Sequence, residues 1–282
     1  GCGRALAQKP AVPVGASDYV ASAIVGDSHY NMRVFANVPP SGVMGKPVLF
    51  VMHGVQRDAD RYRDEWRMLS DRYGVVVLVP EFSEANFPRR ENYNFGGMVG
   101  RDGTMKPRGL WHWQVIEQIF KAFRSRSGSD ASGYDLFGHS AGAQFSHRYA
   151  LFGASPLAQR IISANAGSYS MPVTGKHFPW GIGGVGFGNA ELKAFLVRDG
   201  ILMLGDADTD PKHKSLPRDT EAQVQGPHRL ARGEAFYAAL EAAAAAQHVK
   251  LGWTKVLVPG VAHDNAGMGA AAVKLLYGEP MR

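Results

Sequence analysis

One stretch of the chain decides the fold: Tyr134-Asp135-Leu136-Phe137-Gly138-His139-Ser140-Ala141-Gly142-Ala143. A short apolar strand runs into a Gly-x-Ser-x-Gly turn, and a helix is predicted to begin near Ala141. Such a turn pushes the serine hydroxyl out above the end of a sheet. Gly138 and Gly142 suit it because a Cβ at either position would crowd the strand or the helix. The pattern predicts that Ser140 is a nucleophile rather than a structural serine in a Gly-rich turn.

Short apolar runs alternate with helical patterns along the rest of the chain. Strands are predicted at residues 19–25, 30–37, 47–52, 75–79, 161–165, 200–204 and 253–258. Helices are predicted at residues 58–73, 111–124, 229–246 and 265–276. This alternation predicts an α/β fold with a mostly parallel central sheet and helices on both of its faces.

The length and composition allow one large core. The chain has 282 residues, of which 45% are hydrophobic. We expect residues 1–17 to be a leader remnant or a flexible segment, and residues 18–282 to form a single domain. Loop insertions are predicted near residues 81–109 and 168–188, and loops of that length in a compact domain are usually functional.

The charge pattern limits the expected partners. The formal net charge is +6, but the 31 Lys and Arg residues are scattered, with no run longer than Arg89-Arg90. This scatter favours a solvated basic surface, and no nucleic-acid partner is expected. No apolar stretch reaches the roughly 18 residues of a membrane span, so none is predicted.

The first residues of the chain carry the evidence on where the protein is located in or outside the cell. Ala5-Leu6-Ala7 before Gln8 has the small-x-small form of a signal-peptidase site, which predicts export to the periplasm or secretion. Gly1-Cys2 indicates a second interpretation, in which the protein is a lipoprotein anchored through Cys2. A third interpretation is that the first residues are an artificial start. A cytoplasmic location also stays open. Cys2 is the only cysteine, so an intrachain disulfide and a cysteine-based metal site are both ruled out.

Candidate catalytic residues follow predicted strand ends, where the chemistry of parallel sheets gathers. A serine needs a neighbouring base to become a strong nucleophile. Of the ten histidines, His263 is the best base, because it follows the last strand and comes after the serine and the acid in chain order. The acid that orients its imidazole is expected after the strand at 200–204; Asp208 is favoured there, with Asp206 next.

An oxyanion hole needs two backbone N–H groups aimed at the developing negative charge. Ala141, which follows the nucleophile, is expected to supply one of them. Val55, just after His53-Gly54, is expected to supply the other, with Gln56 as the alternative. His139 adjoins the nucleophile but belongs to the turn, and we expect its side chain to point elsewhere.

A calcium loop is the main metal-binding alternative. Asp206-x-Asp208-x-Asp210 begins like one, but Pro211 stands where the loop glycine is needed and Pro217 where the bidentate glutamate should be. No metal site is therefore predicted.

A second pattern follows the strand at 47–52. It comprises His53-Gly54-Val55-Gln56-x-x-Ala59-x-x-Tyr62, Trp66, Leu69, Tyr73-Gly74-Val75 and Pro80-Glu81. With the serine turn, it makes the chain resemble an α/β-hydrolase from Pro47 to Leu276. Within that superfamily the chain is similar to the polyhydroxyalkanoate depolymerase and feruloyl esterase group of secreted carboxylesterases. It departs from the group at His139, commonly an apolar position, and in lacking cysteines around the oxyanion turn.

The resemblance implies a serine hydrolase. A small-molecule or polymeric carboxylic ester would be cleaved through an acyl-enzyme on Ser140, and water activated through His263 would release the acid. No metal or organic cofactor is required. The loops at 81–109 and 168–188 are expected to cover the acyl pocket, with Trp180 as a substrate contact.

Two other functions fit the same residues. A serine peptidase uses the same constellation for amides, although the chain shows no distinct peptide-binding domain. A catalytically inactive, hydrolase-like binding module usually has a broken triad, whereas every member has a candidate here. The sequence does not indicate the oligomeric state.

Overall fold

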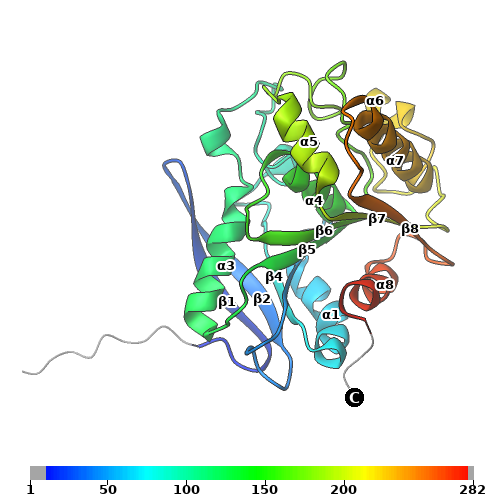
Figure 1. The fold of residues 1–282 in the computed structure, drawn as a ribbon. Helices are drawn as coiled ribbons and strands as arrows, with labels where there is room; N and C mark the ends of the chain where they lie inside the picture. Colours follow the sequence, from blue (N-terminus) through cyan, green and yellow to red (C-terminus); the bar gives the residue numbers. More distant parts are fainter. Residues whose placement is uncertain (1–10, 279–282) are drawn as a thin grey trace, which may run out of the picture.

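The computed structural model describes residues 11–278. Its strands are β1 (Gly15–Val25), β2 (Ser28–Val38), β3 (Val48–Met52), β4 (Val76–Pro80), β5 (Tyr134–His139), β6 (Ala158–Ala164), β7 (Gly200–Gly205) and β8 (Trp253–Val258). Its helices are α1 (Ala59–Tyr73), α2 (Arg89–Asn92), the 3-10 turn η1 (Arg108–Leu110), α3 (Gln114–Ser127), α4 (Ala141–Phe152), α5 (Asn189–Val197), α6 (Thr220–Val224), α7 (Arg229–Ala246) and α8 (Asn265–Tyr277). Figure 1 shows their arrangement.

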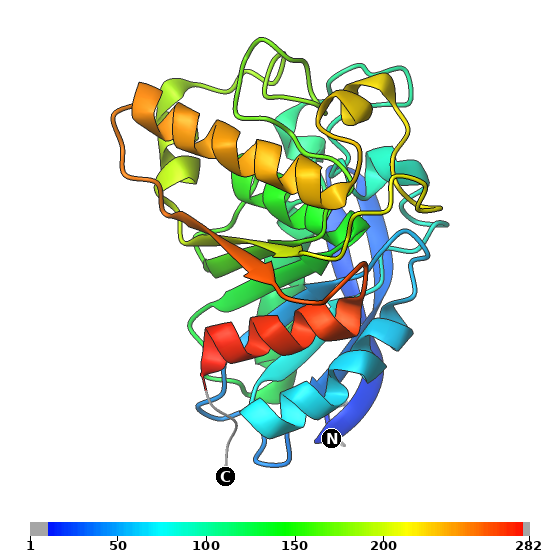
Figure 2. The same ribbon diagram turned by 90° about the vertical axis from the view of Figure 1, so that its right-hand side faces the viewer.

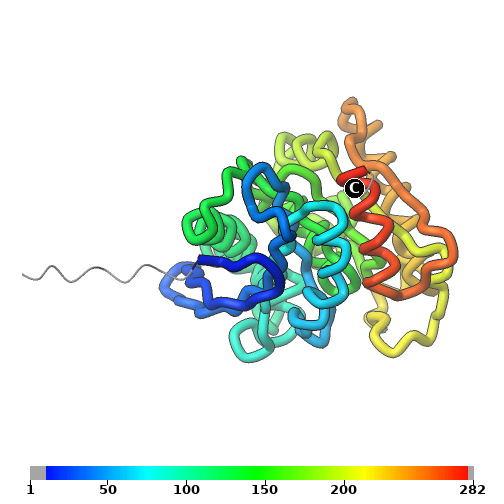
Figure 3. The backbone as a smooth tube through the Cα atoms, turned by 90° about the horizontal axis from the view of Figure 1, so that it is seen from below, coloured from blue at the N-terminus to red at the C-terminus, as the bar shows by residue number. Residues whose placement is uncertain are grey.

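All eight strands form one sheet in the order β1-β2-β4-β3-β5-β6-β7-β8. Strands β1 and β2 form an antiparallel hairpin, and β2 pairs antiparallel with β4. The remaining neighbours in the sheet, from β4 through β3, β5, β6 and β7 to β8, all pair parallel. The hairpin lies at one end of the molecule and the β8 region at the other (Figure 3). The predicted fold class, a mostly parallel sheet in an α/β fold, is confirmed.

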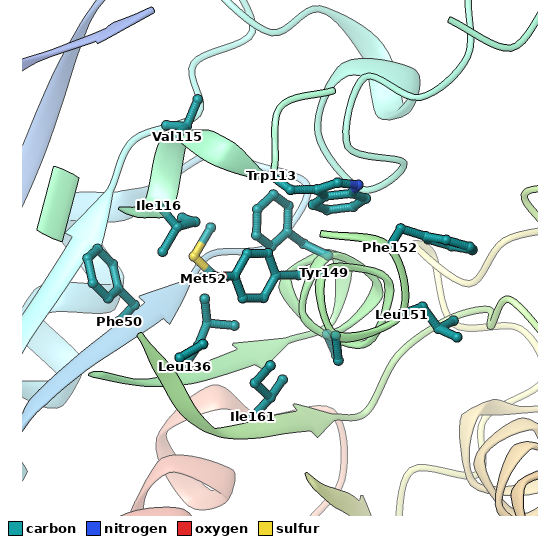
Figure 4. Packing of buried hydrophobic residues seen from close by; sticks show 14 of the residues in the cluster. Phe50, Met52, Trp113, Val115, Ile116, Leu136, Tyr149, Leu151, Phe152 and Ile161 are labelled. Carbon is teal, nitrogen blue, oxygen red and sulfur yellow. The ribbon is translucent and has the colours of Figure 1, made fainter. Parts of the chain in front are cut away.

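Helices cover both faces of the sheet because each face carries its own apolar cluster. One cluster packs α1 and α8 against the sheet, and these two helices lie side by side in Figure 2. The other packs α3, α4, α5 and α7 on the opposite face. Figure 4 shows part of this second cluster, in which side chains such as Phe50 and Leu136 from the strands meet Ile116 and Tyr149 from the helices.

The burial of each strand follows its place in the sheet. The central strands β3, β4, β5 and β7 are buried at every residue, as their continuous apolar runs predict for strands covered on both faces. The edge strand β1 instead alternates exposed and buried residues along its second half. Because β4, β3, β5, β6, β7 and β8 run parallel, their carboxyl ends meet at one edge of the sheet, where the candidate residues are found.

Several boundaries differ from those predicted. The strand β1 begins at Gly15, inside the stretch 1–17 assigned to a leader or flexible segment. The helix α3 begins at Gln114 rather than at residue 111, because Trp111 is still extended. The short helices α5 and α6 were not predicted. The expected signal-peptidase site and Cys2 lie outside the described residues.

The two irregular stretches lie together beside α4. Phe95 of the first stacks edge-on against Phe178 of the second, with ring centroids 6.1 Å apart. Arg148 of α4 is fully buried and donates to the carbonyl oxygens of Asn94 and Pro179, one from each stretch. These contacts hold both loops against the helix that begins at Ser140.

Among the helices of residues 11–278, none has the length and apolar character needed to cross a membrane.

Candidate active site

The serine turn has the strained backbone that its glycines predict. Ser140 lies between β5 and α4 with φ 61° and ψ −120°, a left-handed conformation that is costly for any residue with a side chain. A Cβ on Gly138 would overlap the carbonyl of Gly142, and one on Gly142 would lie 2.8 Å from the carbonyl oxygen of His53. The close approach of strand and helix thus holds Ser140 out at the end of the sheet.

Three side chains from separate loops form a hydrogen-bonded chain. Nε2 of His263 lies 2.8 Å from Oγ of Ser140, and its Nδ1 lies 2.8 Å from Oδ2 of Asp208. With the proton on Nδ1, that nitrogen donates to the carboxylate and Nε2 is free to accept from the serine hydroxyl. This is the geometry in which an imidazole can take a proton from a serine as it attacks.

The structure brings Asp208, and not Asp206, to the histidine. Asp208 is buried, and Arg229 lies behind it with its Nη1 4.0 Å from the other carboxylate oxygen. Burial lowers the pKa of Arg229 to about 10, with the charge of Asp208 opposing it, so the guanidinium stays charged near neutrality. Asp206 is exposed, and its carboxylate accepts from the backbone N–H of Gly260 at 2.8 Å.

Burial also sets the protonation of His263. Only 12% of its side chain is exposed, and burial lowers its pKa below the ordinary value of 6.5. The hydrogen bond to Asp208 acts in the opposite direction, while the positive charge of Arg229 lowers the pKa further. The imidazole is therefore neutral, and able to act as a base, at neutral pH.

The expected oxyanion donors lie beside the serine. Val55 lines the cavity that contains Ser140, and Ala141 is the first residue of α4. Within residues 11–278, neither of their backbone N–H groups has a hydrogen-bond acceptor. Both donors are thus available to a bound oxygen. Gln56, the alternative to Val55, lines the same cavity.

His139 does not point away from the site, contrary to expectation. Its ring lies 4.7 Å from that of His263, centroid to centroid, at 32°. Its Nδ1 lies 3.3 Å from Oη of Tyr62, and its Nε2 lies 3.4 Å from Nδ2 of Asn165. Side chains alternate along a strand, so His139 faces the same side of β5 as Phe137, toward α1 and α8. The same alternation, applied to the predicted strand before Ser140, would have placed His139 on the Phe137 side from the sequence alone.

The site opens into a cavity of about 200 Å³. Its walls come from four places in the chain: Gly54, Val55, Gln56, Asp58, Arg61 and Tyr62; His139 and Ser140; His213, Lys214 and Ser215; His263, Asp264 and Asn265. The segment 213–215 was not predicted to contribute. The ring of His213 stands edge-on to that of His263, with centroids 4.9 Å apart.

The irregular stretches do not reach this cavity. Of the described residues that line it, none comes from 81–109 or 168–188, so the expectation that they cover the acyl pocket is wrong for this cavity. Their aromatic side chains pack on each other and on α4 instead. Trp180 is half-buried in the second stretch, where its carbonyl oxygen accepts from the backbone N–H of Met171, and the structure does not bring it to Ser140.

Within residues 11–278, no group of three or more His, Cys, Asp or Glu side chains is placed to hold a metal ion.

Two solved structures match almost the whole chain. Poly(aspartic acid) hydrolase-1 from Sphingomonas sp. KT-1 is 37% identical over 94% of this chain and 100% of that chain, with a TM-score of 0.89. LpqC, a poly(3-hydroxybutyrate) depolymerase from Bordetella parapertussis, is 29% identical over 96% of this chain and 92% of that chain, also with a TM-score of 0.89. The predicted resemblance to depolymerases and esterases is confirmed.

A more distant structure shares the fold alone. An IroE-like serine hydrolase from Shewanella oneidensis is 12% identical over 93% of this chain and 80% of that chain, with a TM-score of 0.57. No protein-family model matches the sequence, and no curated protein matches it.

Proposed function

Because this chain belongs to the α/β-hydrolase superfamily, we propose that it hydrolyses carboxylic esters through an acyl-enzyme on Ser140. In this proposal His263 is the general base and then the general acid, and Asp208 orients its imidazole. The backbone N–H groups of Val55 and Ala141 form the oxyanion hole. The continuous hydrogen-bonded chain from Ser140 to Asp208, with 2.8 Å at each step, is the observation that carries the proposal.

The reaction follows from these positions. As Oγ of Ser140 attacks the carbonyl carbon, its proton passes to Nε2 of His263, and the carbonyl oxygen becomes an oxyanion facing the two N–H donors. The imidazolium then gives its proton to the leaving alcohol, and the acyl-enzyme remains. Water, deprotonated by the same imidazole, attacks the acyl carbon and releases the acid. Asp208 stabilises the imidazolium through its hydrogen bond to Nδ1.

The substrate class rests on the relatives and on the cavity. One relative is a depolymerase of a polyester, poly(3-hydroxybutyrate). The cavity beside Ser140 is open, so a chain end or loop of a polymer as well as a small ester could reach the serine. We extend the proposal to a single hydrolase domain that begins with β1 at Gly15 rather than at residue 18. We also extend it to an exported protein, since polymers are hydrolysed where they can be reached.

A specific observation favours a second candidate, hydrolysis of an anionic polyamide. The poly(aspartic acid) hydrolase shares 37% of its residues with this chain. Lys214 at the cavity has no ion-pair partner among the described residues, and it would attract a carboxylate-bearing polymer. Raising the salt concentration should then lower kcat/KM for an anionic polymer and leave a neutral ester unaffected.

A fluorophosphonate probe with peptide mass spectrometry tests the proposal. We expect the label on Ser140, and we expect Ser140→Ala and His263→Ala to abolish it. Matched ester and amide substrates then separate the two reactions. A folded protein that neither labels nor cleaves either substrate would refute the hydrolase proposal and favour the inactive binding module.

A further inference from the structure

The buried amide of Asn165 fixes the hydrogen-bond directions behind the triad. Its Oδ1 accepts from the backbone N–H of Gly205 at 2.9 Å, and its Nδ2 donates to the carbonyl oxygen of Ala262 at 3.0 Å. Turning the amide over would set donor against donor and acceptor against acceptor, so this orientation is the one allowed. The second hydrogen on Nδ2 therefore points at Nε2 of His139, 3.4 Å away.

That donor in turn fixes the tautomer of His139. The side chain is 3% exposed, and burial, together with the positive charges nearby, lowers its pKa well below the usual range, so the ring is neutral. A neutral imidazole carries one hydrogen, and its Nε2 must be the acceptor. The hydrogen thus sits on Nδ1, which donates to Oη of Tyr62.

The hydroxyl hydrogen of Tyr62 is not used in this network. The hydroxyl oxygen of Tyr62 accepts from His139, and the backbone N–H of Gly54 is close enough to act on it as a second donor. Burial raises the pKa of Tyr62, so the phenol stays protonated. The side chain lines the cavity that contains Ser140. Among residues 11–278 no protein acceptor is placed for the hydroxyl hydrogen, so it is available to an acceptor bound in the cavity.

The cavity side of Tyr62 adjoins the expected oxyanion hole. A Cβ built on Gly54 would lie 3.1 Å from Oη of Tyr62 and 3.9 Å from Cβ of Ser140, so the phenol and the serine flank the same point. Gly54 leaves that space open, and the next residue, Val55, is the expected oxyanion donor. A substrate oxygen placed there would meet the phenol and the backbone donor together.

We propose that Tyr62 donates a third hydrogen bond to the oxyanion, and that Asn165 and His139 free its hydroxyl hydrogen for this purpose. The inference rests on the proposed serine-hydrolase function. A donor that strengthens as negative charge develops lowers the barrier without tightening ground-state binding, so it acts on kcat rather than on KM. Tyr62 would be a catalytic residue, whereas His139 and Asn165 would be positioning residues.

Tyr62→Phe removes the donor and keeps the ring. We expect kcat for a p-nitrophenyl ester to fall about 100-fold, the lower end for loss of one oxyanion donor, with KM unchanged within twofold. The rate of fluorophosphonate labelling of Ser140 should fall in parallel, because the phosphonyl oxygen occupies the same hole. Tyr73→Phe, eleven residues along the same helix and about 16 Å away, is the matched control and should behave as wild type.

Asn165→Asp tests the positioning. An ionised carboxylate accepts where the amide donated, so the hydrogen of His139 would move to Nε2, and Nδ1 would accept the hydroxyl hydrogen of Tyr62. The phenol would then be turned from the cavity while still present. The same carboxylate oxygen would face the carbonyl oxygen of Ala262, and we expect that repulsion to lower the unfolding temperature of this variant. We expect kcat to fall, and we expect Tyr62→Phe to cause no further loss in the Asn165→Asp background. Coupling through structure would appear in the free energy of unfolding of the double variant as well, so non-additivity in kcat without matching non-additivity in urea denaturation identifies the catalytic role.

The outcomes separate the two proposals. A wild-type chain that neither labels nor hydrolyses esters or amides would refute the hydrolase function and this inference with it. An active wild type would leave that function standing. In that case, a loss below 10-fold in Tyr62→Phe, a loss expressed in KM, or additive effects with Asn165→Asp would each overturn the role of Tyr62 alone. Thermal unfolding of every variant checks that the fold is retained.

Discussion

Replacement of Gly138 by alanine should disable the site without touching any reacting group. The added Cβ would overlap the carbonyl of Gly142 and lie 2.8 Å from the backbone nitrogen of Ala143. Restoring an ordinary contact of 3.4 Å to that nitrogen alone requires a shift of about 0.6 Å, and the carbonyl lies closer still. The first turn of α4, and Ser140 with it, must therefore move by roughly 1 Å.

A shift of that size acts on the 2.8 Å contact between Ser140 and His263. A misplacement of about 1 Å costs on the order of 100-fold in rate, so we expect Gly138→Ala to lower kcat for a p-nitrophenyl ester by about 100-fold. Overpacking should lower the free energy of unfolding by about 1–3 kcal/mol, measured by urea denaturation. The matched control is Gly109→Ala, whose Cβ would meet no heavy atom within 4 Å. Gly138→Ala with kcat within threefold of wild type would refute the argument.

Three further predictions concern the acid, the base and acid stability. Asp208→Asn should lower kcat by about 10³- to 10⁴-fold because an amide cannot stabilise the imidazolium, whereas Asp206→Asn should stay within threefold; equal losses in the ester assay would contradict the assignment. In the proposed mechanism His263 acts as a neutral base, and burial lowers its pKa below 6.5. The value of kcat/KM should therefore rise with pH to half its maximum below pH 6.5, and a midpoint above that value would be inconsistent with this role. Burial lowers the pKa of His53 to about 4 and that of His147 well below its ordinary 6.5. Both therefore stay neutral in the folded chain while the unfolded chain binds their protons, so unfolding free energy should fall from pH 6.5 toward pH 4 by roughly 1.4 kcal/mol per pH unit for each histidine. Urea denaturation of His147→Gln at several pH values should show a shallower slope, and an unchanged slope would count against this origin.

The three side chains that the structure brings into one hydrogen-bonded chain could be predicted, because each follows a local pattern with a fixed consequence. Ser140, Asp208 and His263 come after β5, β7 and β8, and parallel strands place their carboxyl ends at one edge. No long-range contact had to be known in advance. The order of the strands in the sheet brings the three loops within hydrogen-bonding reach.

The rest of the site depends on packing that local patterns do not encode. The loops at 81–109 and 168–188 have the length of functional loops, but the burial of their aromatic side chains against α4 decides their place. Trp180 was assigned to the substrate for the same reason, and the structure places it away from the cavity. The segment at Lys214 was missed because its polar residues look like an ordinary loop until His213 is seen against His263.

Under the proposed mechanism, the choice between an ester and an amide substrate would lie at the cavity rim rather than in Ser140, Asp208 and His263. Both leaving groups take a proton from the imidazolium, but an amide nitrogen is the more basic of the two and depends more strongly on that proton transfer. The lowered pKa of His263 makes its imidazolium a better acid for that step. The same lowered pKa makes the neutral imidazole a weaker base. Stronger stabilisation of the oxyanion by Tyr62 would offset that loss. The same catalytic groups can therefore serve either bond, and the charge on Lys214 is what would distinguish an anionic polymer from a neutral ester.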